Sequence, residues 1–159
     1  MRRAWVLFVF LAGCGEGKPP QPPEKQPEKP SASKLPDRVV YDQILVVFKG
    51  SYARTESERT PEQARALAYN LLDRVRAGVD FDALKREFSD DRNPETGTAL
   101  GPYKSVKSNL RREGDEMPMG NLHKGLAEVV YGLEVGGVGI VDFDPARFPI
   151  GWMLVKRLK

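Results

Sequence analysis

Few residues in this chain of 159 have the type and spacing needed for chemistry. The sequence holds one cysteine, Cys14, and one histidine, His123. A single cysteine forms no disulfide within the chain, and a lone histidine cannot complete a zinc or multi-histidine metal site. What remains is the carboxylate pair Asp90 and Asp91, in the turn-rich segment 89–97. Such a carboxylate is either a solvated turn residue or the polar group of a site.

The charge distribution argues against a nucleic-acid partner. The chain has 25 Lys and Arg against 22 Asp and Glu, but residues 37–159 carry 19 of each sign. The surplus of three comes from Arg2, Arg3 and one net positive charge in 15–36. A nucleic-acid-binding domain needs a basic footprint, and this one has none.

The amino terminus predicts a secretion signal and an anchor. Arg2 and Arg3 precede the apolar run 4–11, which is much shorter than the roughly 20 residues that span a bilayer. The run leads into Leu-Ala-Gly-Cys at 11–14, which resembles the bacterial lipoprotein signal box. An ordinary signal peptide with an incidental cysteine is the alternative. We expect a signal peptide over 1–13, lipidation at Cys14, and a location in the bacterial cell envelope, at the periplasmic face or outer membrane.

Residues 14–36 predict a tether between that anchor and a folded domain. Seven of the 13 prolines lie between residues 15 and 36, interleaved with Lys, Glu, Gln and Ser. Such a segment has too little apolar surface to offset the entropy of ordering the chain. A proline-rich ligand for a partner domain is the alternative.

The first half of the segment that follows, which covers 37–159, predicts a strand and two helices. The β-branched and aromatic run 39–48 is typical of a central strand. Thr-Pro-Glu-Gln at 60–63 predicts a helix start with an N-cap and a capping box, and its apolar stripe runs to Gly78. A second, shorter helix is expected to begin with Asp80 as its cap.

The second half predicts one more helix and two strands. Apolar residues recur at helical spacing over 122–133, and strand-like runs follow at 138–143 and 152–158. With a further strand between the first helices and this last one, the order is strand, helices, strand, helix, two strands. We expect a single α+β domain with a mostly antiparallel four-stranded sheet flanked by about four helices (βαααβαββ).

Six segments of this domain stand in the order of a known family's motifs. They are residues 43–46, 59–64, 77–84, 87–91, 97–101 and 151–156. Together they resemble a parvulin-type (PpiC/rotamase) peptidyl-prolyl cis-trans isomerase domain. The resemblance covers most of 39–159 and is poorest over 105–120, where the chain carries a longer, charged connection.

The resemblance implies rotation of the peptide bond before proline, a step with a barrier of about 18–20 kcal/mol. This chemistry needs a pocket for the proline ring, hydrogen bonds to the flanking backbone and an environment that favours the twisted amide. It needs no cofactor and no metal. The implied partners are proline-containing unfolded or extended polypeptides of the envelope, met by a monomeric domain that touches the membrane only through its lipid anchor.

The family's substrate pocket falls on Leu122 and Leu126 by this resemblance. Tyr103 would lie nearby, and His123 would lie at the rim. Simple core packing of the two leucines is the alternative. His123 is interpreted as an exposed residue at the rim, and a general acid is the other interpretation.

The family's polar cluster falls on Asp91, Gln43 and Met153. Asp91 takes the place of a cysteine or aspartate, and the other two take the places of two histidines. We hypothesise that Gln43, a neutral donor and acceptor, partly replaces a histidine beside Asp91. The rival function is a non-catalytic module that binds unfolded envelope proteins.

Overall fold

The sheet of this protein is built around the strand β1 (Arg38–Val46), which is buried from Tyr41 onward. The computed structural model describes residues 35–53, 55 and 57–159. The predicted signal peptide, the lipidation of Cys14 and the tether up to residue 34 lie outside the described residues. The predicted central strand over 39–48 is confirmed, with its ends shifted by one or two residues.

The sheet has the strand order β3-β2-β1-β5-β4. Strand β1 pairs antiparallel with β2 (Tyr103–Val106) and with β5 (Trp152–Arg157). Strand β4 (Val138–Val141) pairs antiparallel with β5, and β3 (Met117–Pro118) pairs parallel with β2. The predicted mostly antiparallel sheet is therefore confirmed.

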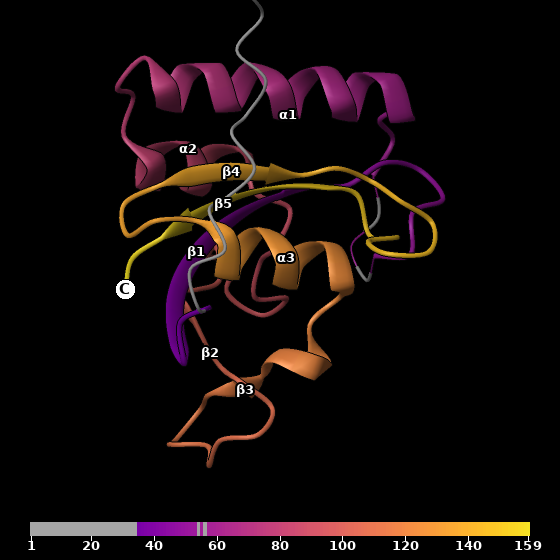
Figure 1. Ribbon diagram of the computed structural model, residues 1–159. Coiled ribbons are helices and arrows are strands. Elements are labelled where there is room, and N and C mark those ends of the chain that lie inside the picture. Colours follow the sequence, from indigo (N-terminus) through magenta and orange to yellow (C-terminus); the bar gives the residue numbers. More distant parts are fainter. Residues whose placement is uncertain (1–34, 54, 56) are drawn as a thin grey trace, which may run out of the picture. The chain divides into compact units, whose positions relative to one another are not determined.

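Helices cover both faces of the sheet. Figure 1 shows α1 (Pro61–Arg76) and α2 (Phe81–Phe88) on one face and α3 (Lys124–Gly132) on the other. Two apolar clusters fill the spaces between these layers. Because side chains alternate along a strand, Ile44 packs toward α1 and α2 while Leu45 packs toward α3.

Local sequence signals account for the first two helices. The Thr60 side chain accepts a hydrogen bond from the Gln63 backbone, and the Gln63 side chain accepts one from the Thr60 backbone, as predicted. The Asp80 side chain likewise caps α2 through the Ala83 N–H. None of the helices in the described part of the chain is long and apolar enough to cross a membrane.

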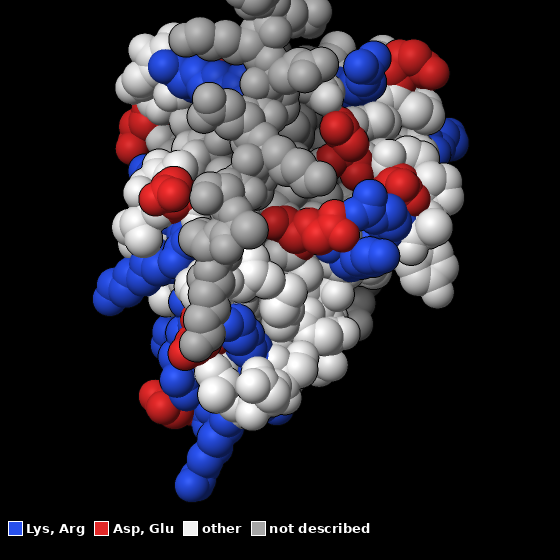
Figure 2. Space-filling model, in the orientation of Figure 1, with Lys and Arg blue, Asp and Glu red and all other residues white. Residues whose placement is uncertain are grey.

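The predicted number of strands is wrong. The sheet has five strands and not four. The additional strand is the two-residue β3, which follows the charged connection and lies beside β2. An ion pair of Arg38 with Glu113 and another with Glu116 hold that connection against the start of β1. These contacts join residues more than 70 positions apart in the sequence, so no local pattern predicts them. Figure 2 shows acidic and basic side chains next to one another at the lower end of the view, where β2 and β3 lie in Figure 1.

The predicted number of helices is also wrong. The described residues form three α-helices and one short 3-10 helix, Met119–Asn121, instead of about four helices. No helix forms between α2 and β2, where the Asn93 side chain accepts hydrogen bonds from the Glu95 and Thr96 N–H groups and stabilises a turn. The last helix covers 124–132 and not 122–133, so Leu122 precedes it.

Candidate active site

Three polar side chains from separate parts of the chain meet on the α3 face of the sheet. Asp91 Oδ2 accepts a hydrogen bond from Gln43 Nε2 at 2.7 Å and another from the Tyr103 hydroxyl at 2.5 Å. Gln43 is buried in β1, whereas Asp91 and Tyr103 are half-buried. Both donors bind the same oxygen, and no hydrogen bond among the described residues reaches Asp91 Oδ1. One carboxylate oxygen is therefore available to a ligand.

The segment before Asp91 is attached to β1 by its own polar side chains. Buried Ser89 accepts hydrogen bonds at its hydroxyl from the Leu45 N–H at 3.2 Å and from the Asp91 N–H at 3.3 Å. The Asp90 carboxylate accepts one from the Val47 N–H at 2.9 Å and pairs with Arg59 at 2.6 Å. The two adjacent aspartates therefore differ: Asp90 fixes the segment, and Asp91 joins the polar cluster.

Tyr41 supports this cluster from the same face of β1. Its ring stacks on that of Tyr103, with centroids 5.7 Å apart. Burial raises the pKa of Tyr41 to about 12, and the nearby Asp91 carboxylate adds to the shift. Burial and the hydrogen bond to Asp91 also raise the pKa of Tyr103. Both phenols are therefore protonated at neutral pH, and the Tyr103 hydroxyl serves as a donor.

Met153, predicted to take a histidine's place, lies in the apolar core. It is 2% exposed and lies opposite Leu45 in the β1–β5 register. It belongs to the same apolar cluster as Leu126, and half-buried Leu122 packs against this cluster. The structure therefore brings Gln43, Asp91 and Tyr103 together by hydrogen bonds and places Met153 in apolar surroundings on the same face.

His123 stands apart from this cluster. Its side chain is exposed, and its ring meets the edge of the Phe148 ring with centroids 5.7 Å apart. It takes the N-cap position of α3 without a capping hydrogen bond from its side chain. This placement is that of an exposed residue and is compatible with the predicted position at the rim.

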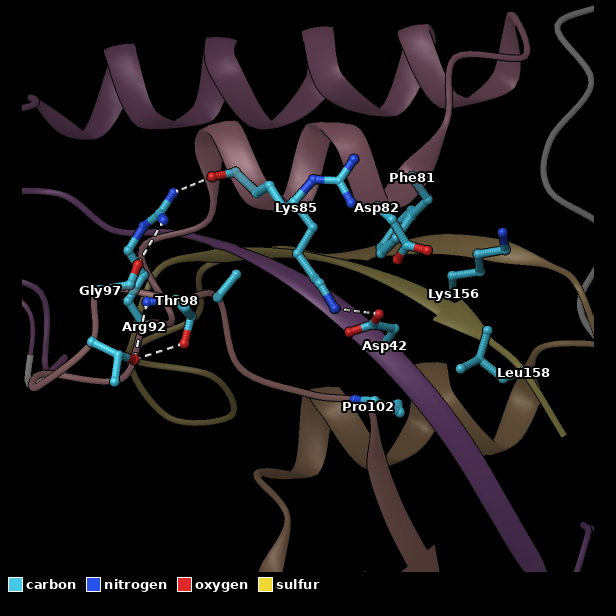
Figure 3. Close-up of a pocket in the computed structure, with 13 residues that line it drawn as sticks. Asp42, Phe81, Asp82, Lys85, Arg92, Gly97, Thr98, Pro102, Lys156 and Leu158 are labelled. Carbon is cyan, nitrogen blue, oxygen red and sulfur yellow. Dashed lines mark hydrogen bonds and ion pairs between the residues drawn. The ribbon is translucent and has the colours of Figure 1, made fainter.

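The opposite face of β1 carries a buried ion pair directly behind Gln43. Asp42 Oδ1 accepts a hydrogen bond from the Gln43 N–H at 2.9 Å, and Asp42 Oδ2 pairs with Lys85 Nζ of α2 at 2.6 Å. The two side chains are only 7% and 11% exposed. Their bond is the dashed line that joins Lys85 to Asp42 in Figure 3. Asp42 therefore holds the backbone that carries the Gln43 amide.

A glycine lets the chain pass close to this pair on its way to Tyr103. Gly101 has φ +104°, and a Cβ atom there would lie 2.6 Å from Asp42 Oδ1. That separation is far inside van der Waals contact, so a larger residue would displace the carboxylate or the loop. Sequence reasoning missed the Asp42–Lys85 pair, because its partners are 43 positions apart. It also missed Tyr41, although Tyr41 and Gln43 are two residues apart in a strand and so share a face.

Comparison with known families identifies the family of this domain. The sequence matches the PPIC-type PPIase domain over residues 29–156. The match covers well over half of the chain, and the chain therefore belongs to the family of PPIC-type peptidyl-prolyl cis-trans isomerase domains. The predicted resemblance to parvulins is confirmed at this level, and the α+β fold agrees with it. A search among curated proteins found no match of significance.

The cluster offers hydrogen bonding and one negative charge beside an apolar surface. No group of three or more His, Cys, Asp or Glu side chains in the described part of the chain could hold a metal ion. No ion pair among the described residues includes Asp91. Both of its partners are neutral, so its charge is solvated by dipoles and is not cancelled by a cation.

Proposed function

We propose that this domain is an active peptidyl-prolyl cis-trans isomerase that rotates X-Pro bonds in unfolded secreted or envelope proteins. The observation that carries the proposal is the convergence of Gln43 and Tyr103 on one oxygen of Asp91, next to the apolar cluster that contains Leu126. Family membership supports the reaction class. The polar cluster supports a working site in which neutral donors take the place of histidines.

The reaction requires only that the protein holds the substrate and places a suitable charge beside the amide. Resonance in a planar X-Pro amide puts partial positive charge on nitrogen and partial negative charge on oxygen, and twisting removes both. A negative charge held beside the carbonyl oxygen therefore destabilises the planar amide relative to the twisted one. Asp91 supplies that charge through Oδ1. A hundredfold acceleration requires only about 2.7 kcal/mol of such a preference.

The remaining residues orient the carboxylate and hold the substrate. Gln43 and Tyr103 fix Asp91 by hydrogen bonds to Oδ2, which leaves the other oxygen directed to the ligand. Leu122 and Leu126 receive the proline ring. Buried Met153 keeps the surroundings apolar, which strengthens the field of a nearby charge.

Exchange of a proline peptide tests the isomerase directly. We expect the purified full chain to broaden and merge the cis and trans NMR signals of an Ala-Pro peptide. Asp91→Asn should reduce the exchange rate by at least tenfold, because it removes the charge at nearly constant shape. Asp73→Asn, an exposed change on α1, is the matched control and should leave the rate unchanged. Equal rates for Asp91→Asn and the wild type would contradict the proposed role of the charge.

The burial of Met153 favours a second candidate function, a non-catalytic binding module. The position that the resemblance gives to a histidine here offers no hydrogen bond and packs in the core. A binder would shift the peptide signals without faster exchange, and the shifts would persist in Asp91→Asn. The same NMR titration therefore separates the two functions.

We further propose that Cys14 anchors the domain as a lipoprotein in the bacterial envelope. The support is the Leu-Ala-Gly-Cys box after a short apolar run. Each buried methylene of an acyl chain adds about 0.8 kcal/mol of membrane affinity, so a multiply acylated cysteine suffices as an anchor. Cys14→Ser should move the protein from the membrane to the soluble fraction after cell lysis. Retention of this variant on the membrane would contradict the proposal.

A further inference from the structure

A cavity of about 680 Å³ lies on the α2 face of β1, away from the polar cluster around Asp91. This volume is typical of small-ligand sites. Figure 3 shows the side chains that surround it: Lys85 reaches down from α2 to Asp42, Arg92 and Thr98 lie on one side, and Lys156 and Leu158 lie on the other. Pro102 closes the lower side in this view.

The lining of this cavity is positively charged. It includes the cations Lys85, Arg86, Arg92 and Lys156 and the carboxylates Asp42 and Asp82. Lys85 and Asp42 neutralise each other, which leaves three cations against one carboxylate. Charge complementarity therefore favours an anionic ligand.

The cations of the lining differ in how they are held. Arg92 donates hydrogen bonds to the carbonyl oxygens of Arg86, Glu87 and Gly97, and these bonds fix its guanidinium without cancelling its charge. The Lys156 ammonium lies 5.9 Å from the centre of the Phe81 ring, which holds it at the wall by a cation–π contact. The Lys85 ammonium has one hydrogen-bond acceptor among the described residues and retains donors for a ligand.

Apolar and hydroxyl groups complete the surface. Phe81, Pro102 and Leu158 line the cavity beside the cations. Thr96 and Thr98 line it from the turn, and their hydroxyl groups lie 2.8 Å apart in a hydrogen bond. The lining therefore suits a molecule with a negative group, an apolar body and amide groups, and that combination is the chemistry of a peptide carboxylate.

We propose that this cavity binds a carboxylate carried next to an apolar group in a polypeptide. The carboxylate lies between Arg86 and Lys156, and the apolar group rests on Phe81 and Pro102. Two sources share this chemistry: the C-terminal end of a chain, and an acidic side chain that neighbours an apolar residue. The proposal does not depend on isomerase activity, because its residues lie on the other face of β1 from Asp91.

Binding of a minimal probe to the full chain tests the proposal. N-acetyl-leucine carries the carboxylate, and N-acetyl-leucinamide is its uncharged match. We expect the acid to shift the backbone NMR signals of Phe81, Arg86 and Lys156, and the amide to leave them unchanged. Combined Arg86→Gln and Lys156→Gln should weaken binding of the acid by roughly tenfold or more. Lys124→Gln, an exposed cation on α3, is the control and should not change the affinity.

Two results would overturn the proposal. One is equal binding of the acid and the amide, and the other is unchanged affinity in the double variant while its NMR spectrum shows an intact fold. Peptides then identify the source: a free C-terminus that binds more tightly than its amide assigns the chain end, and tighter binding of an amidated peptide with an internal glutamate assigns the side chain. Binding of the acid in this cavity does not bear on the isomerase activity. Absence of isomerase activity likewise does not bear on carboxylate binding in the cavity.

Discussion

The two faces of β1 hold a carboxylate group in opposite ways. Behind the strand, Asp42 is matched with the Lys85 ammonium, and both side chains are largely buried at the wall of the cavity. In front, Asp91 has only the neutral donors Gln43 and Tyr103 and stays half-exposed. A charge that serves the fold is cancelled, whereas a charge that acts on a ligand is oriented by dipoles and left in place.

Three consecutive residues of β1 therefore contribute to two different groups of side chains. Tyr41 and Gln43 face the front, and Asp42 between them faces the back. We call Asp42 and Lys85 the rear pair, and Gln43, Asp91 and Tyr103 the front cluster. Asp42 of the rear pair accepts a hydrogen bond from the Gln43 N–H, so the front cluster depends on the rear pair for its position. The reverse dependence is absent from the contacts, because Asp91 makes no hydrogen bond to Asp42 or Lys85. Damage behind the strand should therefore cost stability, and damage in front should cost activity.

The largest effect should come from breaking the rear pair. Lys85→Met leaves the Asp42 carboxylate buried without its cation, and removal of one partner of a buried pair costs about 3–5 kcal/mol. Urea denaturation should show this loss in the free energy of unfolding. Lys49→Met breaks an ion pair whose side chains are 71% and 90% exposed, and that control should change stability by less than about 1 kcal/mol. Similar losses in the two variants would show that the rear pair is not structural.

A second test replaces Gly101, the glycine that lies against the rear pair. Gly101→Ala meets both an unfavourable φ and the Asp42 carboxylate, and we expect a loss of roughly 1–3 kcal/mol in the free energy of unfolding. Gly78→Ala is a matched control, since Gly78 has a similar φ of +93° but nothing within 4 Å of its Cβ position. The difference between the two losses in the free energy of unfolding measures the effect of the steric contact with Asp42. If the two glycines respond alike, the close approach to Asp42 carries no energy.

A third effect follows from Tyr41, whose ring stacks on that of Tyr103 in the front cluster. The pKa of Tyr41 is raised to about 12, against about 10 in an unfolded chain. The folded state therefore holds this proton more tightly, so the stabilisation is complete below pH 10 and is lost as the pH rises through 12. Between pH 9 and 11 the wild type should lose about 1.4 kcal/mol on this account. Denaturation curves of Tyr41→Phe at the two pH values should lack that part of the loss. If the free energy of unfolding of Tyr41→Phe depends on pH as it does in the wild type, the titrating group is not Tyr41.

Local signals in the sequence predicted the parts of the fold that form from neighbouring residues. The capping box at Thr60 and the cap at Asp80 were correct because each needs only four consecutive residues. Strand β3 was missed because it exists only through pairing with β2 and through distant ion pairs of Arg38. A two-residue strand has no period of its own to detect.

The candidate site was predicted only in part, as the fold was. The juxtaposition of Gln43 and Asp91 followed from the resemblance, and the structure places them 2.7 Å apart. The hydroxyl of Tyr103 was missed as a second donor, because its position depends on how the chain leaves Gly101 and enters β2. The separate role of Asp90 was missed as well, since its partners Val47 and Arg59 are 43 and 31 positions away in the sequence.

The smallest effect on stability, and the most specific one for the front face, should come from Tyr103→Phe. This change removes one donor from Asp91 and keeps the ring that stacks on Tyr41. Because the cluster is half-exposed and water can replace the lost donor, we expect a cost of only about 1 kcal/mol in the free energy of unfolding. Isomerisation should nevertheless slow several-fold, because Asp91 is then held by Gln43 alone. Tyr52→Phe, at a side chain that is 84% exposed, should change neither quantity. A Tyr103→Phe variant with wild-type exchange rates would mean that Gln43 is sufficient to orient the carboxylate, and the contrast between the two faces would then rest on a single neutral donor.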